Sequence, residues 1–320
     1  MKHLYSFSVC QPLTELSENV SEISSCLKSI GCDGLELLTL FENVPEQYIP
    51  YSPSVHLPFA IDWYRAWCGN TPKDEFDEDN VKYVLFGRDR EEMVRNIRSG
   101  IVFASVLRPA YGVMHAGNTN IDQVMLRKHT DDDHKVLDAF CDMMNQVVSE
   151  FPNGEPPFKI AFENLWWSGL KLKEPWEYKL IENKIEFDNW GFCLDTGHMM
   201  NTLSDAYNET SVIDSLLKIF DRFPIDMKER IGTMHFHMST SAEYRNTFET
   251  SERPRSESIL KTLERSYPHV MKIDQHRPFT DSRCIQLVEA LEPDFVTHEM
   301  VGAGSKDPIA DFVQQRSLFR

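Results

Sequence analysis

The chain has 320 residues, of which 50 are acidic and 33 basic, so its formal net charge is −17. This length is enough to bury one large core, and we expect a single domain over residues 1–320. A surface this acidic repels polyphosphate chains, which makes nucleic acid a disfavoured partner unless bound divalent cations reverse the potential locally.

The sequence also indicates the cellular compartment of the protein. It contains no run of about 18 or more apolar residues, which a membrane-spanning helix needs. Glu15 and Glu18 interrupt the first segment before a signal peptide could form. The seven cysteines are scattered and form no C-x-x-C pair, as is typical of reduced thiols. We therefore expect a cytoplasmic protein with no membrane partner, while its oligomeric state is left open.

Eight short apolar runs alternate with longer segments of helical periodicity. The predicted strands are residues 4–9, 33–38, 54–59, 111–116, 158–165, 191–195, 232–237 and 294–299. The predicted helices are residues 20–30, 79–107, 137–151, 211–223, 257–266 and 281–291. This alternation predicts an α/β fold of the (β/α)₈ TIM-barrel type, with a doubly wound open sheet as the competing arrangement.

Two irregular segments interrupt the alternation. They are residues 60–79, after the third predicted strand, and residues 238–257, after the seventh. Loops that follow the strands of a TIM barrel form its active-site face. These excursions are therefore expected either to carry substrate specificity or to be simple solvated surface.

Six of the predicted strands end in a residue type that binds metal ions. These residues are His56, His115, Glu163, Asp195, with His198 just beyond it, His235 and Glu299. Charged groups that converge on one end of a barrel are costly to desolvate unless cations neutralise them. Imidazole mixed with carboxylate suits Zn²⁺, Mn²⁺, Fe²⁺ or Co²⁺. The sequence thus predicts a site for divalent ions at this end of the barrel.

Other ionisable residues near these strands have different expected roles. Strand alternation turns His298 to the face opposite Glu299, so we expect it to be structural. Glu36 is expected to be a buried, paired carboxylate inside the barrel. His237 lies two residues beyond His235, and we expect it to contact substrate or to support a metal ligand.

Aromatic residues follow two of these strand ends. Phe59 comes after His56, and Trp166 and Trp167 come after Glu163. Aromatic faces at a polar mouth suit the C–H faces of sugars, although packing beneath the loops is the alternative. We predict that Phe59, Trp166 and Trp167 contact a small-molecule substrate.

Short motifs on successive strands resemble those of the xylose-isomerase-like TIM-barrel superfamily, which includes sugar and sugar-phosphate isomerases and epimerases as well as endonuclease IV. The resemblance covers roughly residues 4–300. It is carried by the order and placement of CDGLELL, VHLPF, MHAG, FEN, CLDTGH, MHFH and THEM along the chain.

Two branches of this superfamily use these positions differently. The resemblance to the epimerase-like branch implies one divalent metal on Glu163, Asp195, His235 and Glu299. There the two glutamates flank the reacting carbon, and the His198 position contacts substrate. The resemblance to the endonuclease-like branch implies three ions, held in addition by His56, His115, His198 and an Asp-x-His pair.

The segment IDQHRPF offers such a pair as Asp274 and His276. If the preceding VMKI leads into an extended backbone, both side chains face the same way and can reach His198, which would complete nine ligands. The alternative is a surface turn around Pro278.

Three departures weigh against DNA as the substrate. The chain reads HFHMST where the endonuclease-like branch has Asn-Asp, and Ala60 stands where that branch has a bulky aliphatic residue. The span from His235 to Asp274 is also long for that branch.

We therefore expect a metal-dependent isomerase or epimerase that acts on a small sugar, sugar phosphate or related hydroxy-carbonyl substrate. In this hypothesis Glu163 and Glu299 move the proton, and His198 orients the substrate or holds a further ion. The alternatives are an endonuclease IV-like multi-metal phosphodiesterase, another metal-dependent hydrolase, and a non-catalytic metal-dependent binding protein.

Overall fold

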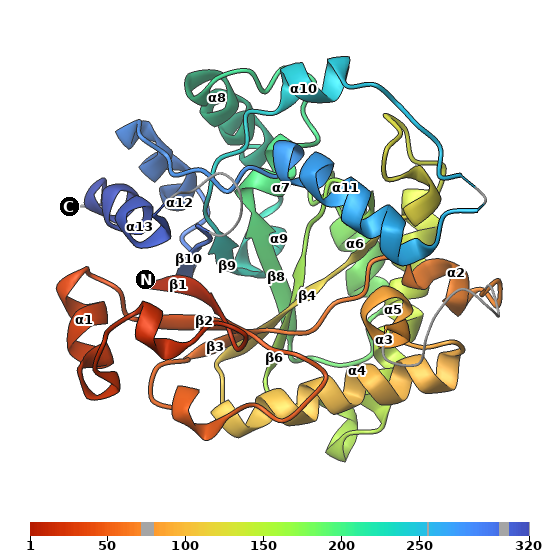
Figure 1. Ribbon diagram of the computed structural model, residues 1–320, viewed down its shortest axis with the longest axis horizontal. Helices are drawn as coiled ribbons and strands as arrows, with labels where there is room; N and C mark the ends of the chain where they lie inside the picture. Colours follow the sequence, from red (N-terminus) through yellow and green to blue (C-terminus); the bar gives the residue numbers. More distant parts are fainter. Residues whose placement is uncertain (72–79, 255, 301–306, 320) are drawn as a thin grey trace.

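The computed structural model describes residues 1–71, 80–254, 256–300 and 307–319. Eight parallel strands close into a barrel in the order β1-β10-β9-β8-β6-β4-β3-β2 (Figure 1). The barrel strands are β1 (Lys2–Ser8), β2 (Gly34–Leu38), β3 (Ser54–His56), β4 (Tyr111–His115), β6 (Lys159–Glu163), β8 (Trp190–Asp195), β9 (Ile231–His235) and β10 (Phe295–His298). The predicted (β/α)₈ barrel is confirmed, and the competing open sheet is wrong.

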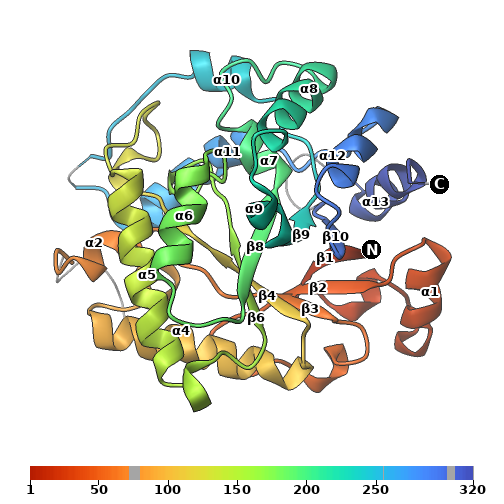
Figure 2. The ribbon, with the colours of Figure 1, turned by 180° about the vertical axis from the view of Figure 1, so that it is seen from behind.

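Helices surround the barrel on its outside (Figures 1 and 2). They are α1 (Ile23–Ser29), α2 (Trp63–Trp67), α3 (Val81–Leu85), α4 (Arg90–Ala104), α5 (Asp133–Ser149), α6 (Pro175–Lys184), α7 (Thr196–Met200), α8 (Glu209–Phe220), α9 (Ile225–Glu229), α10 (Ala242–Thr247), α11 (Ile259–Ile273), α12 (Ile285–Glu289) and α13 (Pro308–Ser317). Short 3₁₀ turns occur at Leu13–Glu15, Val20–Glu22, Glu46–Tyr48, Ser105–Leu107, Ile121–Gln123, Pro152–Gly154 and Ser282–Cys284. Across the described ranges, none of the helices has the length and apolar character needed to cross a bilayer.

The helix predicted over residues 79–107 is two helices, α3 and α4. Phe86 ends α3 in a left-handed conformation with φ of 65°. At Gly87 a Cβ atom would lie 2.7 Å from the backbone nitrogen of Met93, so only glycine fits this close turn. Asp89 then starts α4 by accepting a hydrogen bond from the Glu92 backbone N–H. A continuous apolar pattern therefore concealed a break made by the backbone.

Two further differences concern helix length and number. The helix predicted at 257–266 continues through Pro268 to Ile273, so VMKI, the apolar lead-in to Asp274, is helical. Helices α6 and α13 were not predicted. Both have proline in their first turn, a position where proline costs no helical hydrogen bond.

The two loop excursions contain helices of their own. In residues 60–79, helix α2 buries Trp63, whose indole N–H donates to the Gly117 carbonyl at 2.7 Å; residues 72–79 lie outside the described part of the chain. The second excursion contains α10, and residue 255 lies outside the described part. A small antiparallel pair, β5 (Gly117–Asn118) with β7 (Ser168–Gly169), ties together the loops after β4 and β6.

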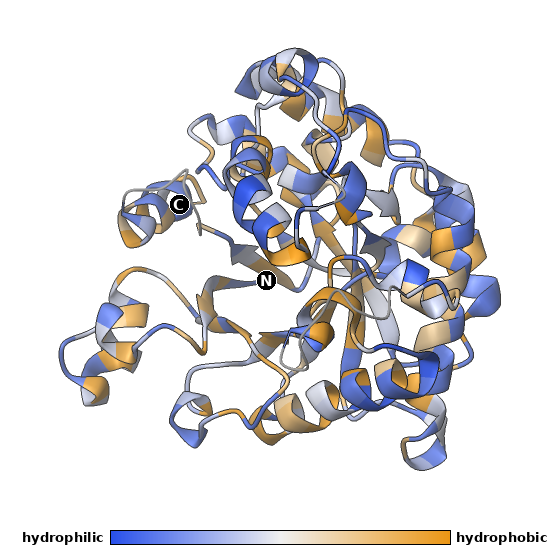
Figure 3. Ribbon diagram, turned by 45° about the vertical axis from the view of Figure 1, so that its right-hand side comes forward, coloured by the Kyte–Doolittle hydropathy of each residue, from blue (hydrophilic) through white to orange (hydrophobic). Residues whose placement is uncertain are grey.

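The barrel interior changes character along its axis. Leu4, Tyr111, Val113, Ala161 and Cys193 form a small apolar cluster inside it, while a larger core lies between the strands and the surrounding helices. Figure 3 shows orange, hydrophobic segments in the middle of the fold, whereas the surrounding helices carry a mixture of hydrophilic and hydrophobic residues. The apolar interior leaves the ionisable residues gathered toward the carboxyl ends of the strands.

His298 lies on the outer face of β10, as predicted. Its Nε2 lies 2.9 Å from Nδ1 of His3, and its Nδ1 accepts a hydrogen bond from the Gln315 side chain at 2.7 Å. Both imidazoles are buried. His298 therefore joins the strand to the C-terminal helix α13.

Candidate metal centre

The strand ends bring six ionisable residues to one rim of the barrel. Parallel pairing sets His115 of β4 opposite Glu163 of β6, and Asp195 of β8 opposite His235 of β9. His56 ends β3, and Glu299 directly follows β10. Because all eight strands run the same way, these residues converge.

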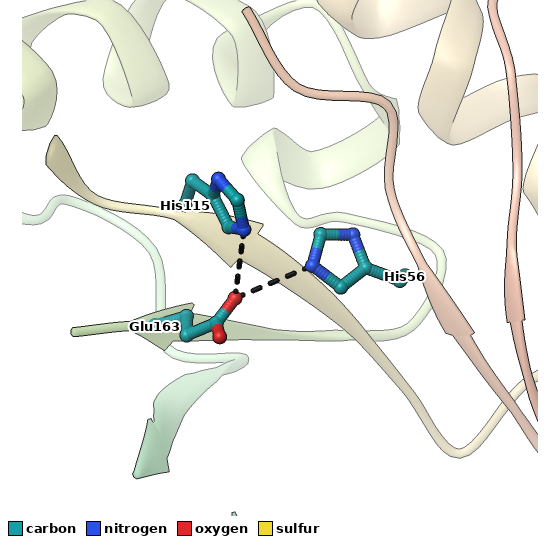
Figure 4. A group of neighbouring side chains, drawn as sticks. All are labelled: His56, His115 and Glu163. Carbon is teal, nitrogen blue, oxygen red and sulfur yellow. Dashed lines mark hydrogen bonds and ion pairs between the residues drawn. The ribbon is translucent and has the colours of Figure 1, made fainter. Parts of the chain in front are cut away.

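The first group of donors consists of His56, His115 and Glu163, here called the Glu163 group (Figure 4). The Nε2 atoms of His56 and His115 lie 3.3 and 3.1 Å from Oε2 of Glu163. Nδ1 of His56 lies 2.9 Å from the Leu57 carbonyl, which can only accept a hydrogen bond, so Nδ1 carries the proton. Nε2 of His56 is thereby left with a lone pair directed at the group.

The second oxygen of Glu163 faces a different imidazole. Nδ1 of His235 lies 3.0 Å from Oε1 of Glu163, 3.4 Å from Oε2 of Glu299 and 3.7 Å from Oδ2 of Asp195. We call Asp195, His235 and Glu299 the Asp195 group. Ligand atoms that share one ion at bond lengths of about 2.0–2.2 Å are separated by distances of this order. Glu163 therefore stands between two candidate ion positions, with one oxygen toward each.

Asp195 also explains why β8 ends on a carboxylate followed by a histidine. Its Oδ1 accepts a hydrogen bond from the His198 backbone N–H at 2.6 Å and caps helix α7. The single helical turn that follows brings His198 back over the same rim. Nδ1 of His198 lies 2.9 Å from the Asn164 carbonyl, which fixes the ring and directs Nε2 away from it.

The third group consists of His198, Asp274 and His276, here called the Asp274 group. Oδ2 of Asp274 lies 3.3 Å from Nε2 of His198 and 2.8 Å from Nε2 of His276. Both members of the pair are buried, so the alternative of a surface turn is wrong. Asp274, directly after α11, has an extended backbone with φ of −96° and ψ of 91°, whereas His276 has φ of 47°, so the pair does not lie on one continuous extended segment as expected.

His237 joins the centre more closely than predicted. Its Nε2 lies 3.0 Å from Oδ2 of Asp195, and its ring stacks on that of His276 with centroids 4.1 Å apart. Nδ1 of His237 is buried with no hydrogen-bond partner among the described residues. A Cβ atom on Gly197 would lie 2.0 Å from this ring, so the glycine of CLDTGH makes room for it.

Glu36 is buried and paired, as predicted, and its partner is a member of the centre. Its Oε1 lies 2.6 Å from Nε2 of His235, and its Oε2 accepts hydrogen bonds from the Tyr111 hydroxyl at 2.6 Å and the Thr297 hydroxyl at 3.0 Å. These contacts hold His235 with Nδ1 toward the carboxylates of the Asp195 group. The sequence indicated the burial of Glu36 but not this contact.

The electrostatic environment favours a positive charge at the rim. Burial alone would raise the pKa of Glu163, but the imidazoles of His235 and His115 outweigh it and hold this pKa well below its ordinary value. Burial would lower the pKa of His198, but the carboxylate of Asp195 and its neighbours raise it well above the ordinary value. Since anionic carboxylates are stabilised here together with cationic partners, a divalent ion fits the same positions.

The donor atoms have the spacing and the chemical type that a divalent transition metal requires. Donor atoms from several sets of three residues lie within 4.8 Å of one another. Those sets are His56, His115 and Glu163; Glu163, Asp195 and His198; Asp195, His237 and Glu299; and His237, Asp274 and His276. Mixed imidazole and carboxylate donors are those that Zn²⁺, Mn²⁺, Fe²⁺ and Co²⁺ accept.

A cavity of about 390 Å³, here called the first cavity, opens onto this centre. His115, His198 and Asp274 belong to both the cavity lining and the centre. The predicted substrate contacts Phe59, Trp166 and Trp167 line it, whereas His237 lies outside this lining and is fully buried. The remaining lining is mostly apolar.

Helix α11, predicted in part as residues 257–266, covers the first cavity, and the sequence did not indicate this position. Leu263, Tyr267, Val270 and Met271 of this helix line the cavity together with the tryptophans. Figure 1 shows α11 crossing in front of the strands of the barrel. Its strongly amphipathic pattern was the available signal, but the sequence does not say which surface its apolar face covers.

Comparisons with known proteins identify the family to which this fold belongs. Residues 85–299, more than half of the chain, match the family described as xylose isomerase-like TIM barrel. No curated protein sequence matches the chain.

Solved structures with the same fold include enzymes of different activities. Endonuclease IV from Thermus thermophilus is 12% identical with a TM-score of 0.52, covering 100% of this chain and 99% of that chain. The apo form of 3-keto-D-glucoside 4-epimerase from E. coli is 14% identical with a TM-score of 0.52, covering 99% and 98%. L-ribulose 3-epimerase is 10% identical with a TM-score of 0.50, covering 98% and 92%. Such identities establish the fold alone, and with the family match they show that the chain belongs to the xylose isomerase-like TIM barrel family.

Proposed function

We propose that the protein is a divalent-metal-dependent hydrolase with a polynuclear centre, and that it acts on a small ester, phosphoester or amide bound in the first cavity. The observation that carries this proposal is the position of Glu163. Its Oε2 faces His56 and His115, and its Oε1 faces His235. A carboxylate with an imidazole donor on each oxygen is suited to bridge two ions.

This arrangement weighs against the isomerase that the sequence favoured. That mechanism needs one oxygen of Glu163 for proton transfer beside the substrate carbon. Both oxygens are instead directed at imidazoles, and neither Glu163 nor Glu299 belongs to the cavity lining. The cavity meets the centre at His115, His198 and Asp274, which belong to the Glu163 and Asp274 groups. A substrate in the cavity would therefore lie between two of the groups.

Divalent ions at such a centre would polarise a substrate oxygen and lower the pKa of a water molecule. His56 and His198 are pre-oriented because their Nδ1 protons are held by the carbonyls of Leu57 and Asn164. Glu299, whose side chain is 14% exposed, is the least buried carboxylate of the three groups. Trp166, whose ring centroid lies 4.9 Å from that of His198, excludes water from this side of the centre.

The covering helix and the charge support a small substrate instead of duplex DNA. Leu263, Tyr267, Val270 and Met271 of α11 line the cavity. A duplex would have to displace this helix to reach the centre. The net charge of −17 would also oppose binding of a polyphosphate.

The isomerase or epimerase is the second candidate, and one specific observation favours it. Nδ1 of His235 lies within 3.7 Å of carboxylate oxygens of Glu163, Asp195 and Glu299. These four side chains are suited to hold a single ion, as the family resemblance implies. A metal-dependent binding protein would share the same side chains but would catalyse no reaction.

The test combines metal counting with two activity assays. Protein reconstituted separately with Zn²⁺, Mn²⁺, Fe²⁺ or Co²⁺ would be analysed for bound metal, then incubated with a panel of small chromogenic esters and phosphoesters and, in D₂O, with ketoses and ketose phosphates. We expect more than one ion per chain and hydrolysis that is lost in Glu163→Gln and retained in Glu18→Gln, an exposed control. A single bound ion with carbon–deuterium exchange would select the isomerase, and bound metal without either reaction would select the binding protein.

A further inference from the structure

A second cavity adjoins the first and has a different chemical lining. Its volume is about 180 Å³, and it shares Val124, Trp166, Trp167 and Val270 with the first cavity. Its polar lining residues are Arg127, His129, Asn201, Arg245, Asn246 and His269. No carboxylate belongs to this lining, although the chain has 50 acidic residues.

The two arginines of this cavity differ from those arginines of the fold that pair with acidic side chains. Arg265 and Arg283, for example, pair with Glu257 and Asp214. Among the described residues, Arg127 and Arg245 form no such ion pair. Within the residues that the structure describes, neither guanidinium is therefore neutralised by a carboxylate; Arg245 is half-buried, whereas Arg127 is exposed and lies over the Phe248 ring.

Arg245 is held in place by neutral groups only. Its Nε donates to the Ser241 hydroxyl at 3.0 Å and its Nη2 donates to the Leu203 carbonyl, while its Nη1 has no hydrogen-bond partner in the described part of the chain. Arg127 likewise donates through Nη2 to the Phe248 carbonyl. Burial lowers the pKa of His129 to about 4, so this imidazole is neutral and the positive charge of the cavity belongs to the arginines.

A chain of hydrogen bonds connects this cavity to the metal centre. The Asn201 side chain donates to Oδ1 of Asp274 at 3.4 Å and accepts from the Ser241 hydroxyl at 2.7 Å. Ser241 in turn accepts from Nε of Arg245. The arginine is thus three hydrogen bonds from Asp274, and Trp166 and Trp167 line both cavities.

We propose that the second cavity binds an anionic group, a carboxylate or a phosphate, at the end of the substrate remote from its reacting bond. Guanidinium groups bind such anions through paired hydrogen bonds. The substrate would place its reacting end at His115, His198 and Asp274, pass the tryptophans and end at Arg245 and Arg127. The assignment of the reacting end rests on the function proposed above, whereas the anion site stands on the second cavity itself.

The first experimental arm uses metal-free protein and inorganic phosphate. Phosphate would be titrated by calorimetry into wild type, Arg245→Gln, Arg127→Gln and the control Arg95→Gln, whose arginine is exposed on α4. We expect the dissociation constant to rise about tenfold or more in the two cavity variants, because a charge-assisted hydrogen bond is lost, and to stay unchanged in the control. Equal phosphate binding by all four proteins, or no binding by wild type, would overturn the proposal.

The second arm uses metal-loaded protein and alkyl hydroxamates, which chelate metal at one end. Hydroxamates with a terminal carboxylate, a terminal phosphate or a neutral terminal carboxamide would be compared over a series of tail lengths. At the best length we expect an anionic tail to improve binding at least about tenfold over the carboxamide, and we expect the ratio of anionic to carboxamide binding to fall to about one in Arg245→Gln. Whichever anionic tail, carboxylate or phosphate, improves binding more over the carboxamide identifies the group that the second cavity prefers.

The two arms separate failure of this inference from failure of the proposed function. If no hydroxamate binds but phosphate binding depends on Arg245, the anion site is upheld and the metal centre is refuted. If all hydroxamates bind equally whatever their tails, the metal centre is upheld and the anion site is refuted. Comparison of the circular dichroism and the urea unfolding midpoint of Arg245→Gln with those of wild type shows that this variant is folded.

Discussion

Substitution of Gly197 by alanine tests whether the metal centre depends on the close approach of His237 to helix α7. The new Cβ atom would lie 2.0 Å from Cε1 and 2.5 Å from Nδ1 of the His237 ring. To reach ordinary van der Waals contact the ring has to move by about 1.4 Å. Such a shift would break the 3.0 Å contact between His237 and Asp195 and disturb the stacking on His276.

The magnitude follows from two opposing terms. Overpacking a buried site costs about 1–3 kcal/mol, whereas alanine in place of glycine in a helix contributes about 1 kcal/mol in the other direction. We therefore expect the free energy of unfolding of the metal-free protein to fall by no more than about 2 kcal/mol. Metal affinity should fall about tenfold to a hundredfold, since displaced groups beside metal ligands have effects of that size.

The assay pairs denaturant unfolding of metal-free protein with a competitive metal titration. Gly232→Ala is the matched control, because its Cβ atom would meet nothing within 4 Å. It should leave both quantities close to those of wild type. If Gly197→Ala binds metal as tightly as wild type does, the reasoning that places His237 at the centre is wrong.

Three further predictions concern metal content, substrate binding and pH. His276→Ala should lower the number of bound ions by one in elemental analysis, because the Asp274 group loses a donor. Trp166→Ala should weaken binding of a carboxamide-tailed hydroxamate by at least about tenfold in calorimetry, because an aromatic wall of the first cavity is removed. Stability should fall as the pH drops from about 6.5 to about 4, because burial lowers the pKa of His3 to about 4 and the unfolded chain then binds the extra proton. Urea titrations over this range should show that His3→Gln reduces this loss by at most about 3 kcal/mol, which is the contribution of this one imidazole.

The controls for these predictions use a histidine outside the centre. His134 is exposed on α5. His134→Ala should keep every bound ion, and His134→Gln should keep the wild-type dependence of stability on pH. A His276→Ala protein with the full metal count would remove the Asp274 group from the centre. Equal acid sensitivity in wild type and His3→Gln would show that His3 is not held neutral.

Much of the fold and part of the site could be read from the sequence. The alternation of apolar runs with helical stripes determined the barrel, because eight strand–helix units have few other ways to bury their apolar faces. The barrel then determined the site in outline, because parallel strands deliver their last residues to one rim. His56, His115, Glu163, Asp195 and His235 were found in this way, since each of them ends a strand.

Three further residues of the site could be placed only from the tertiary structure, because they lie outside the barrel strands. Asp274 and His276 follow helix α11 in the long connection between β9 and β10, and only the path of that helix brings them to His198. His237 lies just beyond the end of β9, where strand alternation no longer fixes the direction of a side chain.

The position and lining of the two cavities also depend on how distant segments pack together. The first is closed by α11, whose amphipathic sequence shows that one face is buried without showing against what. The second brings Arg127 and Arg245, which are far apart in the chain, into one lining. The sequence by itself therefore determined the barrel and the candidate ligands at its strand ends, because these follow from local periodicity. The completed centre and its cavities required the tertiary structure, because they are made by contacts between segments that no periodicity relates.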